Sequence, residues 1–377
     1  MKKLFLILLS ASVFLSACVK EEKAVPAVNP GIPEKETVTL FALGDNLLHM
    51  PVVNSGKKED GSYDYSHIFK ALQPEIKNAD IAVIGQETVF AGKEYGYSGY
   101  PLFNSPSEMG DTLVKEGFDV ILHASNHVMD KGTKGIENTL EFWDSHPEVS
   151  VLGINKSETE KERLKIIKVK GAEIALLNYT YGTNGIPVPQ SKSYLVNIID
   201  RDKIRRDSEF AEKHADFTVA FMHWGTEYSL KPDDSQKSLA REMCEWGVDL
   251  IIGSHPHVIE PFEITESENG NTAPVYYSLG NFVSRQLEAV NLLGGAAKVT
   301  LTFDGKHMKV EKAEFMPVVT HYNRAYRDFT VYPLKSYSDS LAAEHGVSAH
   351  DGAVSVERFR KITDKVFEGY DKSVIDY

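Results

Sequence analysis

Short apolar runs alternate with helical patterns from residue 37 to about residue 290, and this alternation restricts the fold more than any other feature of the sequence. Such runs, bounded by turn residues, are typical of buried strands. The expected strands are 38–43, 81–84, 120–123, 174–177, 218–222, 250–252 and 275–279, and the expected helices lie near 66–78, 106–116, 134–145, 201–214 and 234–246. Strands that alternate with helices predict a parallel-rich α/β sheet covered on both faces. In such sheets ligands bind beyond the carboxyl ends of the strands, so the residues that follow each strand are candidates for a functional site.

The pattern changes after residue 290. Residues 297–303 and 307–319 alternate apolar and polar side chains around Asp304-Gly305, a favourable hairpin turn. We expect this hairpin to close a second sheet or to form its edge. A main domain is therefore expected over residues 37–322, followed by a C-terminal extension, 323–377, that contains a terminal helix.

The N-terminus has the pattern of a secretion signal. Two lysines precede an apolar stretch, 4–17, that is too short to span a bilayer comfortably. The stretch runs into LSAC (15–18), which resembles the lipobox of bacterial lipoproteins, where the cysteine is acylated and becomes the first mature residue. The resemblance implies a signal peptide over 1–17, lipidation at Cys18 and a flexible tether over 18–36. The protein would then be lipid-anchored on the extracytoplasmic face of the cell membrane. The alternative is an ordinary secreted protein cut near the same position.

Composition argues against some partners. The chain has a net charge of −13, and removal of the signal would remove two lysines and no acidic residue. Such acidity disfavours nucleic acid as a partner and gives no electrostatic attraction to an anionic membrane, so acyl chains would have to hold the protein there. With Cys18 lipidated, Cys244 is the one remaining cysteine, and no intramolecular disulfide is expected.

The sixth expected strand runs into Gly253 and is followed by His255, Pro256 and His257. Proline disfavours the helical conformation for the residue before it, so we expect His255 to be extended. In an extended chain, residues two apart project to the same side, and the two imidazoles would then converge. Neutral imidazole is the commonest metal-binding side chain, so the pair is a candidate metal site. The alternative is a pair of surface histidines in a loop.

Polar groups follow the other strands as well. They are Asp45 after the first strand, Glu87 after the second, Asn126 and His127 after the third, His223 after the fifth and Asn281 after the seventh. Imidazoles mixed with carboxylates and an amide suit manganese, zinc or iron better than calcium. Because a carboxylate can bridge two ions, these residues predict a site for one or two divalent metals that activate water. The sequence shows neither a strained nucleophile elbow nor a glycine-rich phosphate loop.

Six motifs lie at or near the expected strand ends. They are GDN (44–46), QE (86–87), ASNHVMD (124–130), MHWGTEY (222–228), GSHPHVIEP (253–261) and YSLGNFV (277–283). Together they resemble the CapA family of bacterial capsule synthesis, which is associated with poly-γ-glutamate and belongs to the calcineurin-like metallophosphoesterase superfamily. The resemblance implies a metallophosphoesterase-like α/β sandwich of two mixed sheets flanked by helices, with the site at the carboxyl ends of the strands.

The resemblance also implies roles for single residues. It implies that Asp45, Glu87, Asn126, His223, His255 and His257 bind metal and that His127 protonates the leaving group. Two positions depart from the superfamily pattern. Leu47 stands where a metal-binding histidine is expected, so His49 is a doubtful substitute, and Glu87 stands where an aspartate bridges the metals. Asp130 and Glu227 have no role in the pattern, and we expect them to cap the turns that follow.

The resemblance implies a membrane-anchored protein of capsule or poly-γ-glutamate biosynthesis with a metal-dependent, phosphoesterase-like hydrolase site. The expected substrate is an anionic polymer or a phosphoester, and the expected partners are other capsule-synthesis membrane proteins. A second hypothesis stays open, in which the chain is a non-catalytic subunit that handles or anchors the polymer. Arg285 and Arg324 could bind an anionic substrate, although a single arginine more often forms a surface ion pair. The segment 91–103, rich in glycine and tyrosine, is a candidate lid for the pocket.

Overall fold

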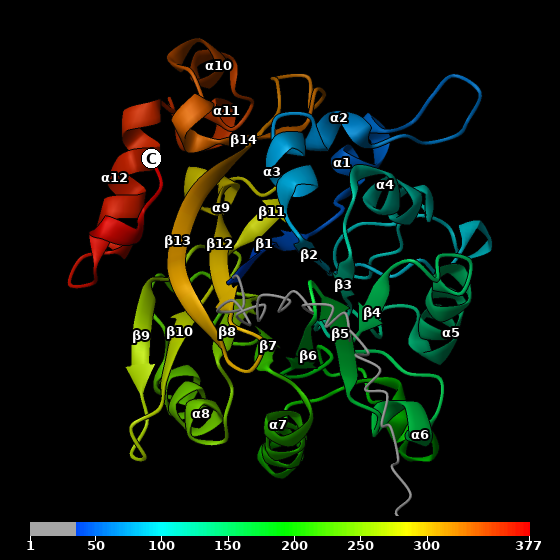
Figure 1. Ribbon diagram of the computed structural model, residues 1–377. Coiled ribbons are helices and arrows are strands. Elements are labelled where there is room, and N and C mark those ends of the chain that lie inside the picture. The colour runs from blue at the N-terminus through cyan, green and yellow to red at the C-terminus, as the bar shows by residue number, and fades with distance from the viewer. Residues whose placement is uncertain (1–34) are drawn as a thin grey trace, which may run out of the picture. The chain divides into compact units, whose positions relative to one another are not determined.

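Figure 1 shows the computed structural model, which describes residues 35–377. The expected signal peptide, Cys18 and nearly all of the expected tether lie outside the described residues. Residues 35–377 form one unit. Among them, no helix is both long and apolar enough to cross a membrane.

The strands form two mixed sheets, as expected. The first has the order β14 (Thr330–Pro333), β13 (Met308–His321), β12 (Leu293–Phe303), β1 (Glu36–Asn46), β2 (Ile81–Gln86), β3 (Val120–Leu122) and β4 (Ser150–Leu152), with β11 (Asn281–Val283) also paired to β1. The second has the order β5 (Lys165–Val169), β6 (Ala172–Thr180), β7 (Phe217–His223), β8 (Leu250–Ser254), β10 (Thr272–Tyr276) and β9 (Phe262–Glu266). Strands β1 to β4 are parallel, and so are β6, β7, β8 and β10. Because these parallel strands end on the same side of each sheet, the residues that follow them gather there.

Helices flank the sheets (Figure 1). Those near the first sheet include α2 (Ser66–Phe69), α3 (Gln73–Asn78), α4 (Glu108–Glu116) and α5 (Gly132–Trp143), and those near the second are α7 (Arg201–His214) and α8 (Asp234–Glu245). Shorter helices are α1 (Met50–Ser55), α6 (Glu158–Lys161) and α9 (Ala289–Leu292), and the C-terminal helices are α10 (Asp339–Glu344), α11 (Ser348–Asp351) and α12 (Val356–Val366). Side-chain caps stand at the start of α7, α8 and α12, whereas α4 and α5 start without one. The Asp233 side chain, for example, accepts the Gln236 N–H at the start of α8 in a complete capping box.

Side chains on alternate positions of the central strands face opposite sides. In β7, Val219 and Phe221 lie in the core that the two sheets share, whereas Ala220 and Met222 pack in a cluster with residues of α7 and α8. The second sheet is therefore buried on both faces. This arrangement explains why its parallel strands are continuous apolar runs in the sequence.

Aspartates fix the register at the start of the parallel strands. The carboxylates of Asp80, Asp119, Asp216 and Asp249 accept hydrogen bonds from the backbone N–H groups of Thr39, Ala82, Glu173 and Thr218, at 2.9, 2.7, 2.8 and 2.7 Å. Each aspartate directly precedes one strand, and each donor belongs to the neighbouring strand. In the β1–β2 pair the register then shifts between Leu43 and Asp45, just before the strands end.

Three expectations about individual elements are wrong. The hairpin of 297–303 and 307–319 extends the first sheet instead of the second, because β12 pairs antiparallel with β1. The strand expected at 275–279 is β10, which ends at Tyr276 because the following residues bond to the loop around residue 260. The helix expected at 66–78 is split into α2 and α3. Pro74 lies in the first turn of α3, where a proline is tolerated, whereas in a helix interior it would break the hydrogen-bond pattern.

The last part of the chain packs on the first sheet. Residues 330–333 add β14 to its edge, and α12 is the expected C-terminal helix. Phe359 of α12 and Phe367 just beyond it are buried in the same core as the strands. Short strands β4, β5, β9, β11 and β14 have no counterpart among the strands expected from the sequence.

Candidate metal centre

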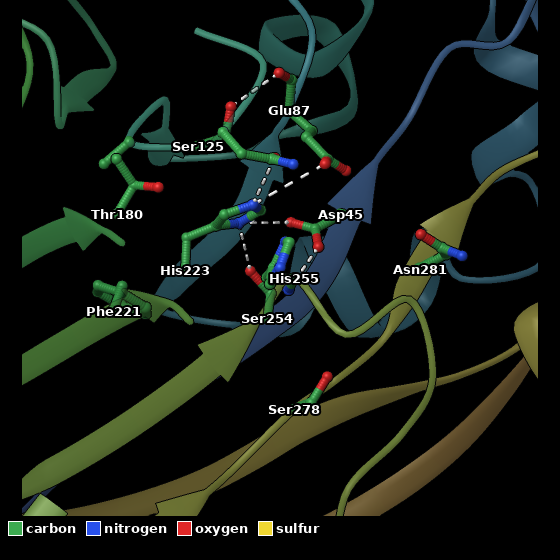
Figure 2. A network of polar contacts seen from close by, with 12 residues as sticks. Asp45, Glu87, Ser125, Thr180, Phe221, His223, Ser254, His255, Ser278 and Asn281 are labelled. Carbon is green, nitrogen blue, oxygen red and sulfur yellow. Dashed lines mark hydrogen bonds and ion pairs between the residues drawn. The ribbon is translucent and has the colours of Figure 1, made fainter. Parts of the chain in front are cut away.

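Residues from both sheets meet where the parallel strands end (Figure 2). Asp45 is the second-last residue of β1, Glu87 directly follows β2, and His223 is the last residue of β7. The loop after β8 supplies His255 and His257. The rule that ligands bind at the carboxyl ends of strands predicts this convergence from the strand positions.

Asp45, Glu87 and His257 form the centre of the site. One ligand atom of each lies within 4.8 Å of the ligand atoms of the other two. Their side chains are buried, with exposed fractions of 1%, 1% and 4%. Neither carboxylate oxygen of Glu87 has a hydrogen-bond partner among the described residues. A buried carboxylate without a partner is costly, so two carboxylates and an imidazole arranged in this way fit a divalent cation.

His223 lies between the two carboxylates (Figure 2). Its Nδ1 is 3.6 Å from Oδ1 of Asp45, and its Nε2 is 3.8 Å from Oε1 of Glu87. Nε2 is also 2.9 Å from Oδ1 of Asn126, and Nδ1 is 3.2 Å from Oγ of Ser254. The structure thus brings His223 and Asn126 together with Asp45 and Glu87, as the sequence predicted.

The backbone at His255 differs from the expectation. His255 has φ of 100° and His257 has φ of 59°, so neither is extended. The His255 N–H donates to Oδ2 of Asp45 at 2.9 Å, and the carbonyl of Pro256 accepts the Tyr228 N–H at 2.8 Å. These tertiary contacts outweigh the local bias of proline. The two imidazoles nevertheless converge, with ring centroids 5.9 Å apart, and the buried Nδ1 of His255 has no partner among the described residues.

Asn281 holds the ring of His257. Its Oδ1 is 3.0 Å from Nδ1 of His257, and its Nδ2 donates to the carbonyl of the same residue and to Oε1 of Gln286. An oxygen acceptor at Nδ1 fixes the tautomer in which Nδ1 carries the proton and Nε2 is free for a metal. Asn281 is therefore a residue that positions His257.

His127 and Asp130 form a buried pair beside the centre. Nδ1 of His127 is 2.8 Å from Oδ2 of Asp130, which also accepts the backbone N–H of Phe103 at 2.7 Å. The Phe103 ring contacts the His127 ring edge to face, with centroids 4.7 Å apart. The expectation that Asp130 caps the following turn is wrong, because α5 starts without a side-chain cap and the carboxylate orients His127 instead.

His49 lies outside the group of Asp45, Glu87 and His257. Its Nδ1 accepts the backbone N–H of Arg285 at 3.3 Å, and its ring packs on Phe103. Burial lowers the pKa of His49 to about 4, so the imidazole is neutral at pH 7. Its contacts are those of a residue in the wall of the neighbouring cleft.

Burial and nearby charges set the ionisation of the centre. Burial, together with the Asp45 carboxylate, raises the pKa of Glu87 well above its ordinary value. Burial also disfavours ionisation of Asp45, but the imidazoles of His223 and His257 outweigh it, and the pKa of Asp45 lies below its ordinary value. Burial lowers the pKa of His255 to about 2, which keeps its ring neutral. Neutral imidazoles are the metal-binding form, and a divalent cation would let both carboxyls ionise.

An open cleft of about 870 Å³ adjoins the centre. His127, His257 and Arg285 line it, and so do residues 100–103 from the segment expected to be a lid. Sequence reasoning missed Asn184, whose Oδ1 accepts a hydrogen bond from Nδ2 of Asn126 at 3.2 Å. It also missed Ser254, which is the last residue of a parallel strand and could have been found by the same rule as the histidines.

Solved structures with a similar arrangement of elements include a calcineurin-like phosphoesterase and a nucleotidase. The calcineurin-like phosphoesterase YfkN from Bacillus subtilis superimposes with a TM-score of 0.45 at 12% identity, covering 89% of this chain and 99% of that chain. The NAD nucleotidase NadN of Haemophilus influenzae gives a TM-score of 0.49 at 10% identity, covering 89% and 60%.

Sequence relatives cover much of the chain. The PGA biosynthesis protein CapA of Bacillus subtilis (strain 168) is 33% identical over 223 residues, which are 58% of this chain and 57% of that protein. The capsule biosynthesis protein CapA of Bacillus anthracis is 28% identical over 288 residues, 74% and 67% of the two chains. The match thus spans between just over half and two thirds of the length of these relatives. The model of the family described as "Bacterial capsule synthesis protein PGA_cap" matches residues 39–286, and the chain belongs to this family.

Proposed function

We propose that this chain is a metal-dependent hydrolase that acts on the extracytoplasmic face of the cell membrane in the assembly of poly-γ-glutamate or a similar anionic polymer. Family membership and the names of the two CapA relatives support the process. The LSAC sequence at 15–18 supports a lipid anchor at Cys18. Other membrane proteins of polymer assembly are the expected partners, and the net charge of −13 argues against nucleic acid.

One observation carries the hydrolase part of the proposal. Asp45, Glu87 and His257 converge in the interior, and Glu87 has no hydrogen-bond partner among the described residues. These three residues would hold a divalent ion, with His223, His255 and Asn126 beside them. Such an ion, when bound, lowers the pKa of a coordinated water and polarises the scissile group.

The protein's own side chains supply the proton transfer. Asp130 accepts the Nδ1–H of His127, which orients the ring and leaves Nε2 as the ring atom available to transfer a proton to the leaving group. His127 lines the cleft, where the leaving group of a bound substrate would lie. His127 is therefore the general acid of the proposed reaction, and Asp130 positions it.

A second candidate function is a non-catalytic subunit that handles or anchors the polymer. One observation favours it. The family resemblance implies a ligand histidine two residues after Asp45, where this chain has Leu47, and Leu47 is buried, with an exposed fraction of 2%, in the wall of the cleft. A site with fewer ligands would hold one ion more readily than two, and a single structural ion does not require turnover.

The experiment is a measurement of metal content on the purified full-length protein, paired with a screen for phosphodiester and γ-glutamyl hydrolysis with and without added manganese. Bound metal with turnover supports the hydrolase and identifies the bond. Near-stoichiometric metal without turnover favours the subunit. The anchor is tested separately by mass spectrometry of the mature N-terminus: acylated Cys18 should be the first residue, and a mature chain that starts elsewhere or carries no acyl group would contradict lipidation at this residue.

A further inference from the structure

Arg285 is the one arginine of residues 35–377 with a buried side-chain nitrogen that lacks a hydrogen-bond partner. Arg201, Arg205 and Arg358 pair with the carboxylates of Glu242, Glu209 and Asp351. Arg285 forms no ion pair with any residue in 35–377, and its buried Nε has no hydrogen-bond partner there. The missing ion pair alone does not distinguish it, because Arg206, Arg324 and Arg360, among others, form none within that range either; the buried Nε without a partner does. Leaving charged hydrogen-bond donors unsatisfied is unfavourable, so this guanidinium suits an external anion.

The guanidinium of Arg285 rests on a fixed aromatic platform. Its carbon Cζ lies 4.4 Å from the centroid of the Tyr326 ring. The Tyr326 hydroxyl is 2.7 Å from Nε2 of His350, and its ring packs beside Tyr322. A ring contacts one face of the guanidinium and leaves the N–H groups at its edge available for a planar anion.

The segment that carries Arg285 is tied to the metal centre. Asn281 bonds to the His257 ring through Oδ1 and to Gln286 through Nδ2. The backbone N–H of Arg285 donates to His49, and the carbonyl of Gln286 accepts the Tyr322 hydroxyl. The position of Arg285 relative to the candidate ligand His257 is therefore set by hydrogen bonds on both sides of it.

The charge of the cleft makes this position selective. Among the described residues that line the cleft, Arg285 is the one lysine or arginine, and it shares the walls with Asp130, Glu227 and Glu288. These carboxylates repel an anion in the rest of the cleft, whereas the guanidinium and a metal ion at the centre would attract one. A substrate with one oxyanion near the reacting bond could contact the guanidinium while that bond lies at the metal centre.

We propose that Arg285 is a specificity-determining residue that binds an oxyanion of the substrate, a carboxylate or a phosphate, next to the bond that reacts at the metal centre. This inference rests on the proposed function. In a γ-linked glutamate chain every unit carries a free α-carboxylate, and in a phosphodiester polymer every unit carries a phosphate. Either polymer would supply the anionic partner that the Arg285 guanidinium lacks.

The test measures binding, so that it does not depend on turnover. The probes are a γ-linked glutamate trimer, the same trimer with its α-carboxylates converted to carboxamides, and glycerophosphoglycerol, each titrated calorimetrically into manganese-loaded full-length protein. Arg285→Gln should weaken binding of at least one anionic probe by about 10-fold or more, and Arg285→Lys by less, because lysine keeps the charge without the planar fork. The carboxamide trimer should bind the unmodified protein no more tightly than the acidic trimer binds Arg285→Gln.

The matched control is Arg360→Gln. Arg360 also lies over a tyrosine, Tyr377, at 5.4 Å from the ring centroid, and it does not line the cleft. Its substitution should leave every dissociation constant and the metal content unchanged.

The outcomes distinguish the ligands. If binding of the glutamate trimer depends on Arg285, the ligand is a carboxylate, and if binding of glycerophosphoglycerol depends on it, the ligand is a phosphate. Equal binding by the Arg285→Gln and Arg360→Gln variants, or no binding of either anionic probe to the unmodified protein, overturns the assignment. Absence of turnover alone contradicts the hydrolase and leaves this result standing.

Discussion

Nδ1 of His127 lies 2.8 Å from Oδ2 of Asp130, and both side chains are buried. The carboxylate accepts the Nδ1–H and so fixes the direction in which Nε2 points. Asp130→Asn should therefore lower kcat by about 100-fold on a substrate with an alkyl leaving group, because a general acid contributes about 10²–10⁴-fold. A p-nitrophenyl ester, whose leaving group needs no proton, should be affected much less. Equal losses on both substrates, or loss of metal, would show that Asp130 does not act through proton transfer.

Two substitutions separate proton transfer from metal binding. His127→Ala should abolish turnover of substrates with poor leaving groups and retain the metal, whereas His257→Ala should lose the metal, because His257 belongs to the buried group with Asp45 and Glu87. Metal content and kcat are measured on the same preparations. His146→Ala is the control. Nε2 of His146 lies 3.0 Å from Oδ1 of Asp111, away from the cleft, so this substitution should change neither the metal content nor kcat. The reverse pattern for the two site variants would refute the roles assigned to them.

Stability should depend on pH through Asp249. Burial raises the pKa of Asp249 from 3.8 to about 7, although the Thr218 N–H partly opposes this. Between these values the folded state holds the proton more tightly than the unfolded state, so the contribution of Asp249 to stability falls as the pH rises from about 4 to about 7. Asp249→Asn keeps an acceptor for the Thr218 N–H and removes the charge. The variant should match the unmodified protein near pH 4 and be more stable by about 1–2 kcal/mol at pH 8 in urea unfolding, allowing for partial exposure.

Asp80 serves as the control for this prediction, because the pH dependence of its contribution to stability has the opposite sign. Asp80 occupies the same position before β2, but hydrogen bonds from Lys170 and Thr39 outweigh burial and lower its pKa. The contribution of the Asp80 carboxylate to stability is present at neutral pH and is lost as the pH falls below the ordinary pKa of an aspartate. Asp80→Asn should therefore destabilise the protein at pH 7, and the difference should shrink at low pH. If both variants followed the same pH profile, burial of Asp249 would not be the cause.

Because Gly253 has no side chain, two neighbouring groups can approach its backbone closely, just before the loop that carries His255 and His257. A Cβ at this position would lie 2.0 Å from the carbonyl oxygen of Tyr277 and 2.4 Å from Nε1 of Trp224, which themselves form a hydrogen bond of 3.0 Å. Gly253→Ala should lower the unfolding free energy by about 2–4 kcal/mol, because backbone and a buried ring would have to shift. Gly182→Ala is the matched control, since its Cβ would have no neighbour within 4 Å. A cost for Gly253→Ala no greater than for the control would contradict this packing.

The convergence of the site's side chains could be predicted from the sequence, whereas their backbone conformations and contacts could not. Asp45, Glu87 and His223 were found because the carboxyl ends of parallel strands meet, a rule that needs only the strand positions. Sequence periodicity does not show which strands pair, and so the hairpin of β12 and β13 was assigned to the wrong sheet. Edge strands such as β5, KIIKV, are half exposed and have too little apolar pattern to be recognised.

Long-range hydrogen bonds account for the remaining differences. The positive φ of His255 accompanies a bond from its N–H to Asp45, a residue 210 positions away. The pairing of Asp130 with both His127 and the Phe103 N–H likewise depends on a loop 27 residues upstream. Local preference alone predicts an extended His255 and a turn-capping Asp130, and the tertiary contacts override both.

The central claim is that Asp45, Glu87 and His257 hold a divalent metal ion. The most direct test is elemental analysis of the purified full-length protein after loading with manganese or zinc and dialysis, with Glu87→Gln treated in parallel. We predict about one or two bound ions per chain in the unmodified protein and a large loss of metal in Glu87→Gln, which removes the carboxylate that has no other partner. Folded protein that retains no metal under any loading condition, or a Glu87→Gln variant that binds as much metal as the unmodified protein, would contradict the account.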